Sequence, residues 1–174
     1  MKPLLYIVTP VSRPENLGRV ALSFRNLVNF FEVRWLPIFD NLGPDLGGGR
    51  KRNTALNQIV EPGWIYFLDD DNQIHPLFPS LLSSAISHHP TARMFVFHQA
   101  NADGSPRIGF CVDEVRCGTF DTARFLVHSE AVGEARWPEN DYFTDSHFAA
   151  HLVNVLHIQP VFLPEIACYY NALS

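Results

Sequence analysis

Short apolar runs separated by helical patterns organise the first half of the chain. Residues 4–8 are apolar without alternation, which is typical of a strand covered on both faces of a sheet. A second strand is predicted over 33–39, and the apolar run 64–68 predicts a third, buried strand. Apolar residues recur at helical spacing over 17–28, and a second helix is predicted over 52–60, where Glu-Pro-Gly ends it. This alternation of strands and helices over about 70 residues predicts a parallel α/β unit.

The second half of the chain has a weaker pattern. We predict a helix over 77–87, a strand over 94–98 and a further helix over 145–157. Apolar and polar residues alternate only weakly over 107–127, and this stretch contains two glycines, which indicates short strands and loops. Residues 161–163 are predicted to form an edge strand, because a proline flanks them on each side.

Composition restricts the class of protein and its partners. The 174 residues are 47% hydrophobic and 18% charged, so we expect a single α/β domain over residues 1–174. The net charge of −5 argues against a nucleic-acid partner. No apolar stretch is long enough to span a bilayer, so no transmembrane segment is expected. Three cysteines without CxxC spacing predict neither a disulfide framework nor a zinc site, and a cytoplasmic location is expected.

Three consecutive carboxylates, Asp69–Asp71, follow directly after the apolar run 64–68. Adjacent like charges repel and resist burial, so a plain exit from a strand has little use for them. Carboxylate oxygens at the carboxyl end of a buried strand suit a hard cation such as Mn²⁺ or Mg²⁺, with water and phosphate oxygens as further ligands. The alternative is a solvated acidic loop. The sequence does not favour an EF-hand loop, because no glycine or distal glutamate lies at the required offsets.

A basic segment precedes this strand and lies at the start of the second helix. Residues 50–53, Arg-Lys-Arg-Asn, follow a glycine-rich loop, and arginine together with helix N-terminal amides suits a diphosphate. The alternative is a solubilising loop. Asp40, where the second strand ends, is a candidate to bind a base or ribose, or else an exposed turn residue. Thr9, Pro10 and Arg13 follow the first strand and are expected to face the same cleft.

Asp145 lies at the start of the last predicted helix. Thr144 or Asp145 could be the N-cap of that helix. The functional alternative is a general base that takes a proton from an attacking hydroxyl. Local sequence leaves both interpretations open.

Taken in order, these segments resemble GT-A glycosyltransferases, most closely the glucuronyltransferase (GT43-type) branch, while family 2 glycosyltransferases share the general layout. The resemblance covers residues 4–78 well and 107–151 more loosely. It implies a GT-A-like domain with a Rossmann-type, mostly parallel sheet flanked by helices. It also implies a nucleotide-binding half over 1–72 and an acceptor and catalytic half over 73–174. The segments that carry it are Thr9–Pro10, Arg13–Pro14, Arg52–Asn53 with Ala55–Leu56, and Ile65–Asn72.

The family implies a nucleotide-sugar donor, usually a UDP-sugar, with Mn²⁺ or Mg²⁺ bound through an acidic DXD-type motif. By position, Asp71 would be the principal metal ligand, Asp70 would contact ribose and metal, and Asp145 would be the catalytic base. Residues 117–120 resemble the segment that shapes the donor-sugar pocket. The remaining donor-binding residues that the resemblance implies are Thr9, Pro10, Arg13 and Asp40 for the nucleoside, Arg52 for the diphosphate, and Asp69.

Two positions depart from the family pattern. Relatives have an additional arginine where this chain has Gly47–Gly49, and Arg50 is the expected substitute. Many relatives use a C-terminal histidine near the diphosphate, for which Tyr170 or Asn171 is the expected replacement. The chain is short for the fold, so a partner subunit or a homo-oligomer would complete the acceptor side.

The expected reaction moves a hexosyl or glucuronyl group from the nucleotide-sugar to a hydroxyl of a glycan or other acceptor. A single base with no evident covalent nucleophile predicts inversion. Two alternatives remain. A haloacid-dehalogenase-like phosphatase also places an Asp-x-Asp motif after an apolar strand, but on its first strand, and a phosphomonoester assay would detect it. A non-catalytic nucleotide-sugar-binding module would bind UDP with metal and turn over no donor.

Overall fold

A seven-stranded sheet is the centre of the part of the chain that the computed structural model describes, which is residues 2–40, 42–43, 45–107, 115 and 120–174. The strand order is β2-β1-β3-β6-β5-β7-β4. The strands are β1 (Leu4–Pro10), β2 (Glu32–Ile38), β3 (Trp64–Phe67), β4 (Gln73–Ile74), β5 (Met94–Asn101), β6 (Phe125–His128) and β7 (Val161–Tyr170). The helices are α1 (Leu17–Ser23), α2 (Gly49–Leu56), α3 (Phe78–His88), α4 (Ser129–Val132) and α5 (Thr144–Asn154).

The first half of the chain is the predicted parallel unit. Strand β1 pairs in parallel with β2 on one side and with β3 on the other. Antiparallel pairing enters with β6, which joins β3 to β5, and with β4 at the far edge. The α/β fold class is therefore confirmed, with a mixed sheet that is parallel through β1, β2 and β3.

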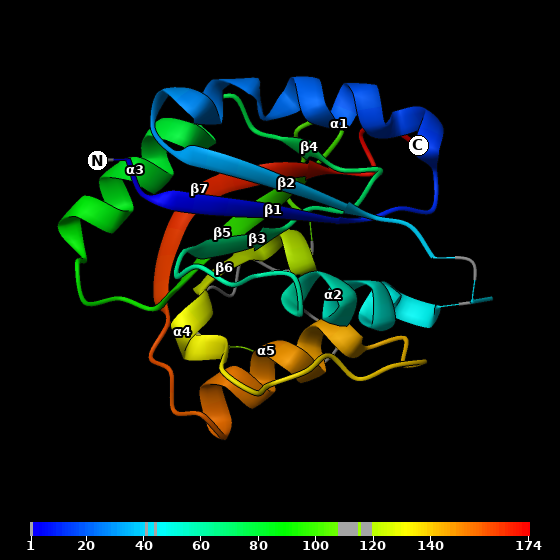
Figure 1. Cartoon of the computed structure of the whole chain (residues 1–174). Helices are drawn as coiled ribbons and strands as arrows, with labels where there is room; N and C mark the ends of the chain where they lie inside the picture. The colour runs from blue at the N-terminus through cyan, green and yellow to red at the C-terminus, as the bar shows by residue number, and fades with distance from the viewer. Residues whose placement is uncertain (1, 41, 44, 108–114, 116–119) are drawn as a thin grey trace.

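Helices cover both faces of this sheet, and alternate side chains of β1 enter two separate cores (Figure 1). Leu5 and Ile7 pack on the side of α1 and α3, whereas Tyr6 and Val8 pack on the side of α2 and α5. A strand covered on both faces must be apolar at every position, which explains the unbroken apolar run. No helix within the described segments is long and apolar enough to cross a membrane.

The strand predicted over 161–163 is longer than expected, because β7 is ten residues long. It pairs with β5 in parallel, and within the described residues it pairs with β4 only at Cys168 and Tyr169. Residues 161–163 are therefore at the edge, as predicted, while the end of the strand lies inside the sheet. Its ladder with β5 is interrupted between Phe162 and Ile166. Pro164 lies within this irregularity, where a missing backbone N–H removes no ladder hydrogen bond.

Several helix boundaries also differ from the prediction. Helix α2 spans 49–56 instead of 52–60, because Gly48 in the left-handed conformation (φ 72°) starts it earlier. The helix predicted over 17–28 divides into α1 and a 3₁₀ helix over 25–29. Helix α5 ends at Asn154, three residues before its predicted end, and β4 and α4 were not predicted. Of residues 107–127, those at 108–114 and 116–119 lie outside the described residues.

Candidate active site

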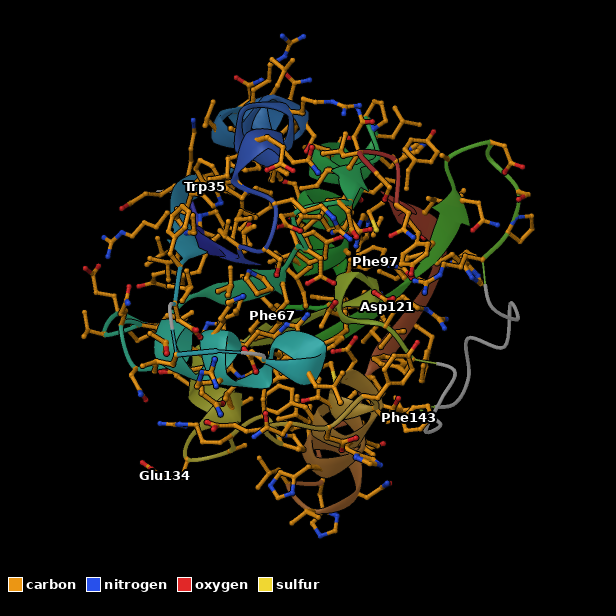
Figure 2. All side chains as sticks on the ribbon, turned by 90° about the vertical axis from the view of Figure 1, so that its right-hand side faces the viewer. Trp35, Phe67, Phe97, Asp121, Glu134 and Phe143 are labelled. Carbon is orange, nitrogen blue, oxygen red and sulfur yellow. The ribbon has the colours of Figure 1, made fainter. Side chains whose placement is uncertain are left out.

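A cleft of about 390 Å³ opens at the carboxyl ends of β1 and β3. Figure 2 looks toward this end of the sheet, with Asp121 and Phe143 labelled on the side that faces the viewer. Both halves of the chain line the cleft. The first half contributes Pro10, Ser12, Arg13, Asp45, Arg52 and Asp69–Asp71, and the second contributes Arg107, Asp121, Tyr142, Phe143, Asp145 and Tyr170, among others.

Asp70 joins the ends of β1 and β3. Its side chain is buried, and its Oδ2 accepts hydrogen bonds from the backbone N–H groups of Ser12 and Arg13. Its Oδ1 accepts from Nη1 of Arg13 at 3.2 Å. Charge-assisted bonds of this kind are about twice as strong as neutral ones. Asp70 therefore fixes the loop after β1 against the acidic triplet.

Asp71 is partly buried and faces the same arginine. Its Oδ2 lies 2.8 Å from Nη1 of Arg13. Burial raises the pKa of Asp71, the charge of Asp69 raises it further, and Arg13 opposes both effects. The Arg13 side chain is 46% exposed, so it can leave this position without a large rearrangement.

Arg52 connects the triplet to the second half of the chain. Its guanidinium is buried, with Nη2 2.6 Å from Oδ1 of Asp69 and Nη1 3.3 Å from Oδ1 of Asp145. The ring of Trp137 lies 4.8 Å from the guanidinium carbon, and the carbonyl of Gly47 accepts a further hydrogen bond. Arg52 thus lines the cleft as a positioning residue that holds two carboxylates, with little surface left for a diphosphate.

Asp145 belongs to the first turn of α5, and the N-cap position is occupied by Phe143. The alternative that Thr144 or Asp145 is the N-cap is therefore wrong. Burial raises the pKa of Asp145 to about 7, because charge is poorly solvated there. Arg52 lowers this pKa, while Asp121 and Asp69 raise it. A partly buried carboxyl with a pKa near neutral is suited to proton transfer.

Sequence reasoning missed a second arginine–aspartate pair at the cleft. Nη1 of Arg107 donates to Asp121 and, at 3.1 Å, to Oε1 of Gln99. Nε2 of Gln99 donates to Oδ1 of Asp121 at 3.0 Å. The guanidinium of Arg107 lies against the ring of Tyr170, which was the expected replacement for the histidine. Asn171, the other candidate, does not line the cleft.

Thr9, Asp40 and Arg50, which were predicted at the donor site, do not line the cleft and bind other residues of the protein instead. Thr9 is buried, and its hydroxyl accepts a hydrogen bond from Nε1 of Trp35 at 3.0 Å. Asp40 accepts two hydrogen bonds from Arg50, at 3.0 and 2.9 Å, which lower the pKa of Asp40. Arg50 is thereby engaged away from the expected diphosphate site. The segment 117–119, expected at the donor sugar, lies outside the described residues, whereas Phe120 lines the cleft.

The charges of the cleft fit a divalent cation. Six carboxylates face three guanidiniums among the described residues that line it. Within the described ranges, no group of three or more His, Cys, Asp or Glu side chains is arranged to hold a metal by itself. Mg²⁺ and its analogues are commonly held by one or two carboxylates together with phosphate oxygens and water. Asp71, with Asp69 beside it, is the donor set that suits such a site.

Glycines let the loop before α2 approach the segment that presents Asp145. A Cβ on Gly47 (φ 74°) would lie 2.4 Å from the carbonyl oxygen of Asp141. A Cβ on Gly49 would lie 2.2 Å from the carbonyl oxygen of Pro138. The backbones of the two halves therefore touch at this point, and only glycine permits it.

We expect Gly49→Ala to lower the free energy of unfolding by about 1–3 kcal/mol, because the added methyl group cannot be accommodated. Gly49 has φ −60°, so backbone strain makes no contribution. Gly18→Ala is the matched control, since Gly18 lies in α1 with open space around it. It should raise the free energy of unfolding by about 0.5–1 kcal/mol through helix propensity. Urea unfolding measures the free energy of unfolding of both variants. Equal changes in the two variants would contradict the close approach of Gly49 to Pro138.

No protein-family model matches the chain, and no curated protein matches its sequence. Solved structures match the fold. S. aureus TarS (residues 1–349) has a TM-score of 0.64 at 14% identity, covering 98% of this chain and 60% of that one. Glucosyl-3-phosphoglycerate synthase from Mycobacterium tuberculosis, in complex with Mn²⁺, UDP-glucose and phosphoglyceric acid, has a TM-score of 0.69 at 13% identity. The match covers 97% of this chain and 72% of that one. Mannosyltransferase PcManGT from Pyrobaculum calidifontis, in complex with GDP-Man and Mn²⁺, has a TM-score of 0.65 at 12% identity. The match covers 98% of this chain and 57% of that one.

Identities this low show the fold alone. The fold is that of GT-A glycosyltransferases, so this part of the predicted resemblance is confirmed. The chain spans 60% of the length of the TarS structure.

Proposed function

We propose that this protein is a metal-dependent glycosyltransferase that moves a sugar from a nucleotide-sugar, a UDP-sugar, to an acceptor hydroxyl with inversion. The observation that carries the proposal is one cleft with two parts: a carboxylate-rich corner at Asp69–Asp71 and the partly buried carboxyl of Asp145, whose pKa is near neutral. The GT-A-like fold supports it. Within the family, the sequence resemblance favours the glucuronyltransferase branch, with a hexose or a hexuronic acid as the transferred sugar.

The acidic corner would hold Mn²⁺ or Mg²⁺, with Asp71 as the principal ligand and Asp69 beside it. The cation, when bound, neutralises charge on the leaving diphosphate. Arg13 would then bind a phosphate oxygen of the donor, because its side chain is exposed and can move away from Asp71. Asp70 keeps the loop that carries Arg13 and Pro10 in place for the nucleoside. Thr9 and Asp40 would reach the nucleoside only by exchanging their present partners.

Asp145 would act as the general base. In its ionised form it takes the proton of the acceptor hydroxyl while the acceptor oxygen bonds to the anomeric carbon. The bond from that carbon to the diphosphate oxygen breaks, and its electron pair leaves with the nucleoside diphosphate. Arg52 holds the carboxylate of Asp145 toward the cleft at 3.3 Å and stabilises its ionised form. A displacement with one base and no covalent step inverts the anomeric centre.

The proposal is tested by ligand-dependent stability. UDP with Mn²⁺ should raise the unfolding temperature, whereas UDP with a chelator should raise it much less, because binding to the folded state stabilises it by mass action. A panel of UDP-sugars and GDP-sugars then identifies the donor. No metal-dependent binding of any nucleotide would contradict the proposal. Binding without turnover of any donor would instead support the nucleotide-sugar-binding module, and hydrolysis of a generic phosphomonoester would support the phosphatase.

A further inference from the structure

Two large aromatic side chains at the mouth of the cleft are exposed to solvent. Tyr142 is 75% exposed and Phe143 is 46% exposed, and both line the cleft. Their rings meet edge to face, with centroids 5.4 Å apart. Most large aromatic side chains of this protein are buried in the two cores, as Phe148 and Trp137 are. Neither ring is used in the reaction described above.

The backbone that carries these rings is held in place by short-range contacts. Oδ1 of Asp141 accepts a hydrogen bond from the backbone N–H of Phe143 at 2.9 Å, and its Oδ2 faces the ring of His147. The hydroxyl of Thr144 donates to the carbonyl of Pro138 at 2.7 Å. The exposure of Tyr142 and Phe143 is therefore a feature of a fixed segment.

The two rings lie next to the base in the chain and in space. Phe143 precedes Asp145 by two residues at the start of α5, and Tyr142, Phe143 and Asp145 line one cleft. The short 3₁₀ helix η3 (Leu46–Gly48) contacts α5 here, and its Leu46 is 51% exposed. The aromatic surface thus borders the place where an acceptor hydroxyl must meet Asp145.

We propose that Tyr142 and Phe143 form the acceptor subsite and that the acceptor is a neutral saccharide whose pyranose ring stacks on them. This inference rests on the proposed function and names its acceptor class. A pyranose offers an apolar C–H face to an aromatic ring and hydroxyl groups to the carboxylates beside it. An anionic acceptor would meet the excess of carboxylates that lines the cleft, so a neutral sugar is favoured.

Saturation-transfer-difference NMR tests the subsite directly. The wild-type protein, loaded with UDP and Mg²⁺, is titrated with the methyl glycosides of glucose, galactose, mannose, N-acetylglucosamine and glucuronic acid. At least one neutral glycoside should bind with its signals concentrated on one ring face, and the glucuronide should bind more weakly. Tyr142→Ala and Phe143→Ala should each weaken binding of that glycoside by about 10-fold, in line with the loss of one stacked aromatic contact.

Tyr142→Phe should bind as wild type does, because the ring and not the hydroxyl carries the contact. Phe39→Ala is the matched control, since Phe39 is 59% exposed but does not line the cleft. Failure of every neutral glycoside to bind, or unchanged binding by both alanine variants, would overturn the subsite. A shift of oligomeric state in the alanine variants without glycoside binding would also overturn it, by assigning the rings to an interface between copies. UDP binding is measured in the same samples, so failure of the proposed function is seen separately.

Discussion

Asp145→Asn is expected to lower the rate of sugar transfer by about 10²–10⁴-fold, the usual contribution of a positioned general base. Asparagine preserves the size of the side chain, but it cannot accept the proton of the acceptor hydroxyl. Metal-dependent UDP binding should stay within about 2-fold, the range of context effects for a residue that does not touch the donor. The rate with the donor identified in the nucleotide-sugar panel, and UDP affinity by calorimetry, measure the two effects.

Glu134→Gln is the matched control for this variant. Glu134 is exposed and does not line the cleft, so its loss of charge should change neither rate nor binding (Figure 2). Full activity of Asp145→Asn would remove Asp145 from the mechanism. Loss of UDP binding in the same variant would instead assign Asp145 to the donor site.

The pH dependence of the wild-type rate reports on the same carboxyl group. Because the base must be ionised and its pKa is about 7, the rate should rise with pH and level off above about pH 7. Burial raises this pKa above its value in the unfolded chain, so the folded state binds the proton more tightly. The resulting contribution to stability is present at low pH and is lost as pH rises through about 7. Asp145→Asn should therefore flatten both profiles.

The fold of the first half of the chain could be predicted because its signals are local. The apolar runs of β1 and β3 are unbroken, and the acidic triplet follows one of them directly, so its position at the sheet edge follows from the strand itself. Strand β7 could not be predicted in this way. Pro164 argued against a long strand, and only the interrupted pairing with β5 makes it acceptable.

The ion pairs of the site could not be read from the sequence. Arg50 and Arg52 are neighbours in the basic segment, yet Arg50 binds Asp40 and Arg52 binds Asp69 and Asp145. Residues two apart on a helix point in different directions, so the two arginines meet different partners. The place of Asp121 in the cleft depends on how the chain around it packs against Gln99 and Arg107. No local pattern in the sequence marks Asp121 as a site residue.

The second prediction with a large expected effect concerns the carboxylate-rich corner at Asp69–Asp71. Asp71→Asn should weaken Mn²⁺-dependent UDP binding by about 100-fold or more, since the loss of partners that only support a metal ligand already costs 10–100-fold. The amide keeps a hydrogen-bonding oxygen but lacks the charge that a hard cation requires. The fold should survive, because Asp71 is partly buried beside like charges that raise its pKa, and neutralising it removes repulsion. Circular dichroism and urea unfolding check this point.

Asp103→Asn provides the control for the charge, since Asp103 is exposed in a turn outside the cleft. The informative quantity is the ratio of UDP affinities with and without Mn²⁺, which removes any effect on the nucleoside contacts. Wild-type protein and Asp103→Asn should share a large ratio, and Asp71→Asn should give a ratio near one. An unchanged ratio in Asp71→Asn would place the cation elsewhere. A ratio near one in all three proteins would mean that UDP binding does not depend on Mn²⁺, which would contradict the proposed metal site.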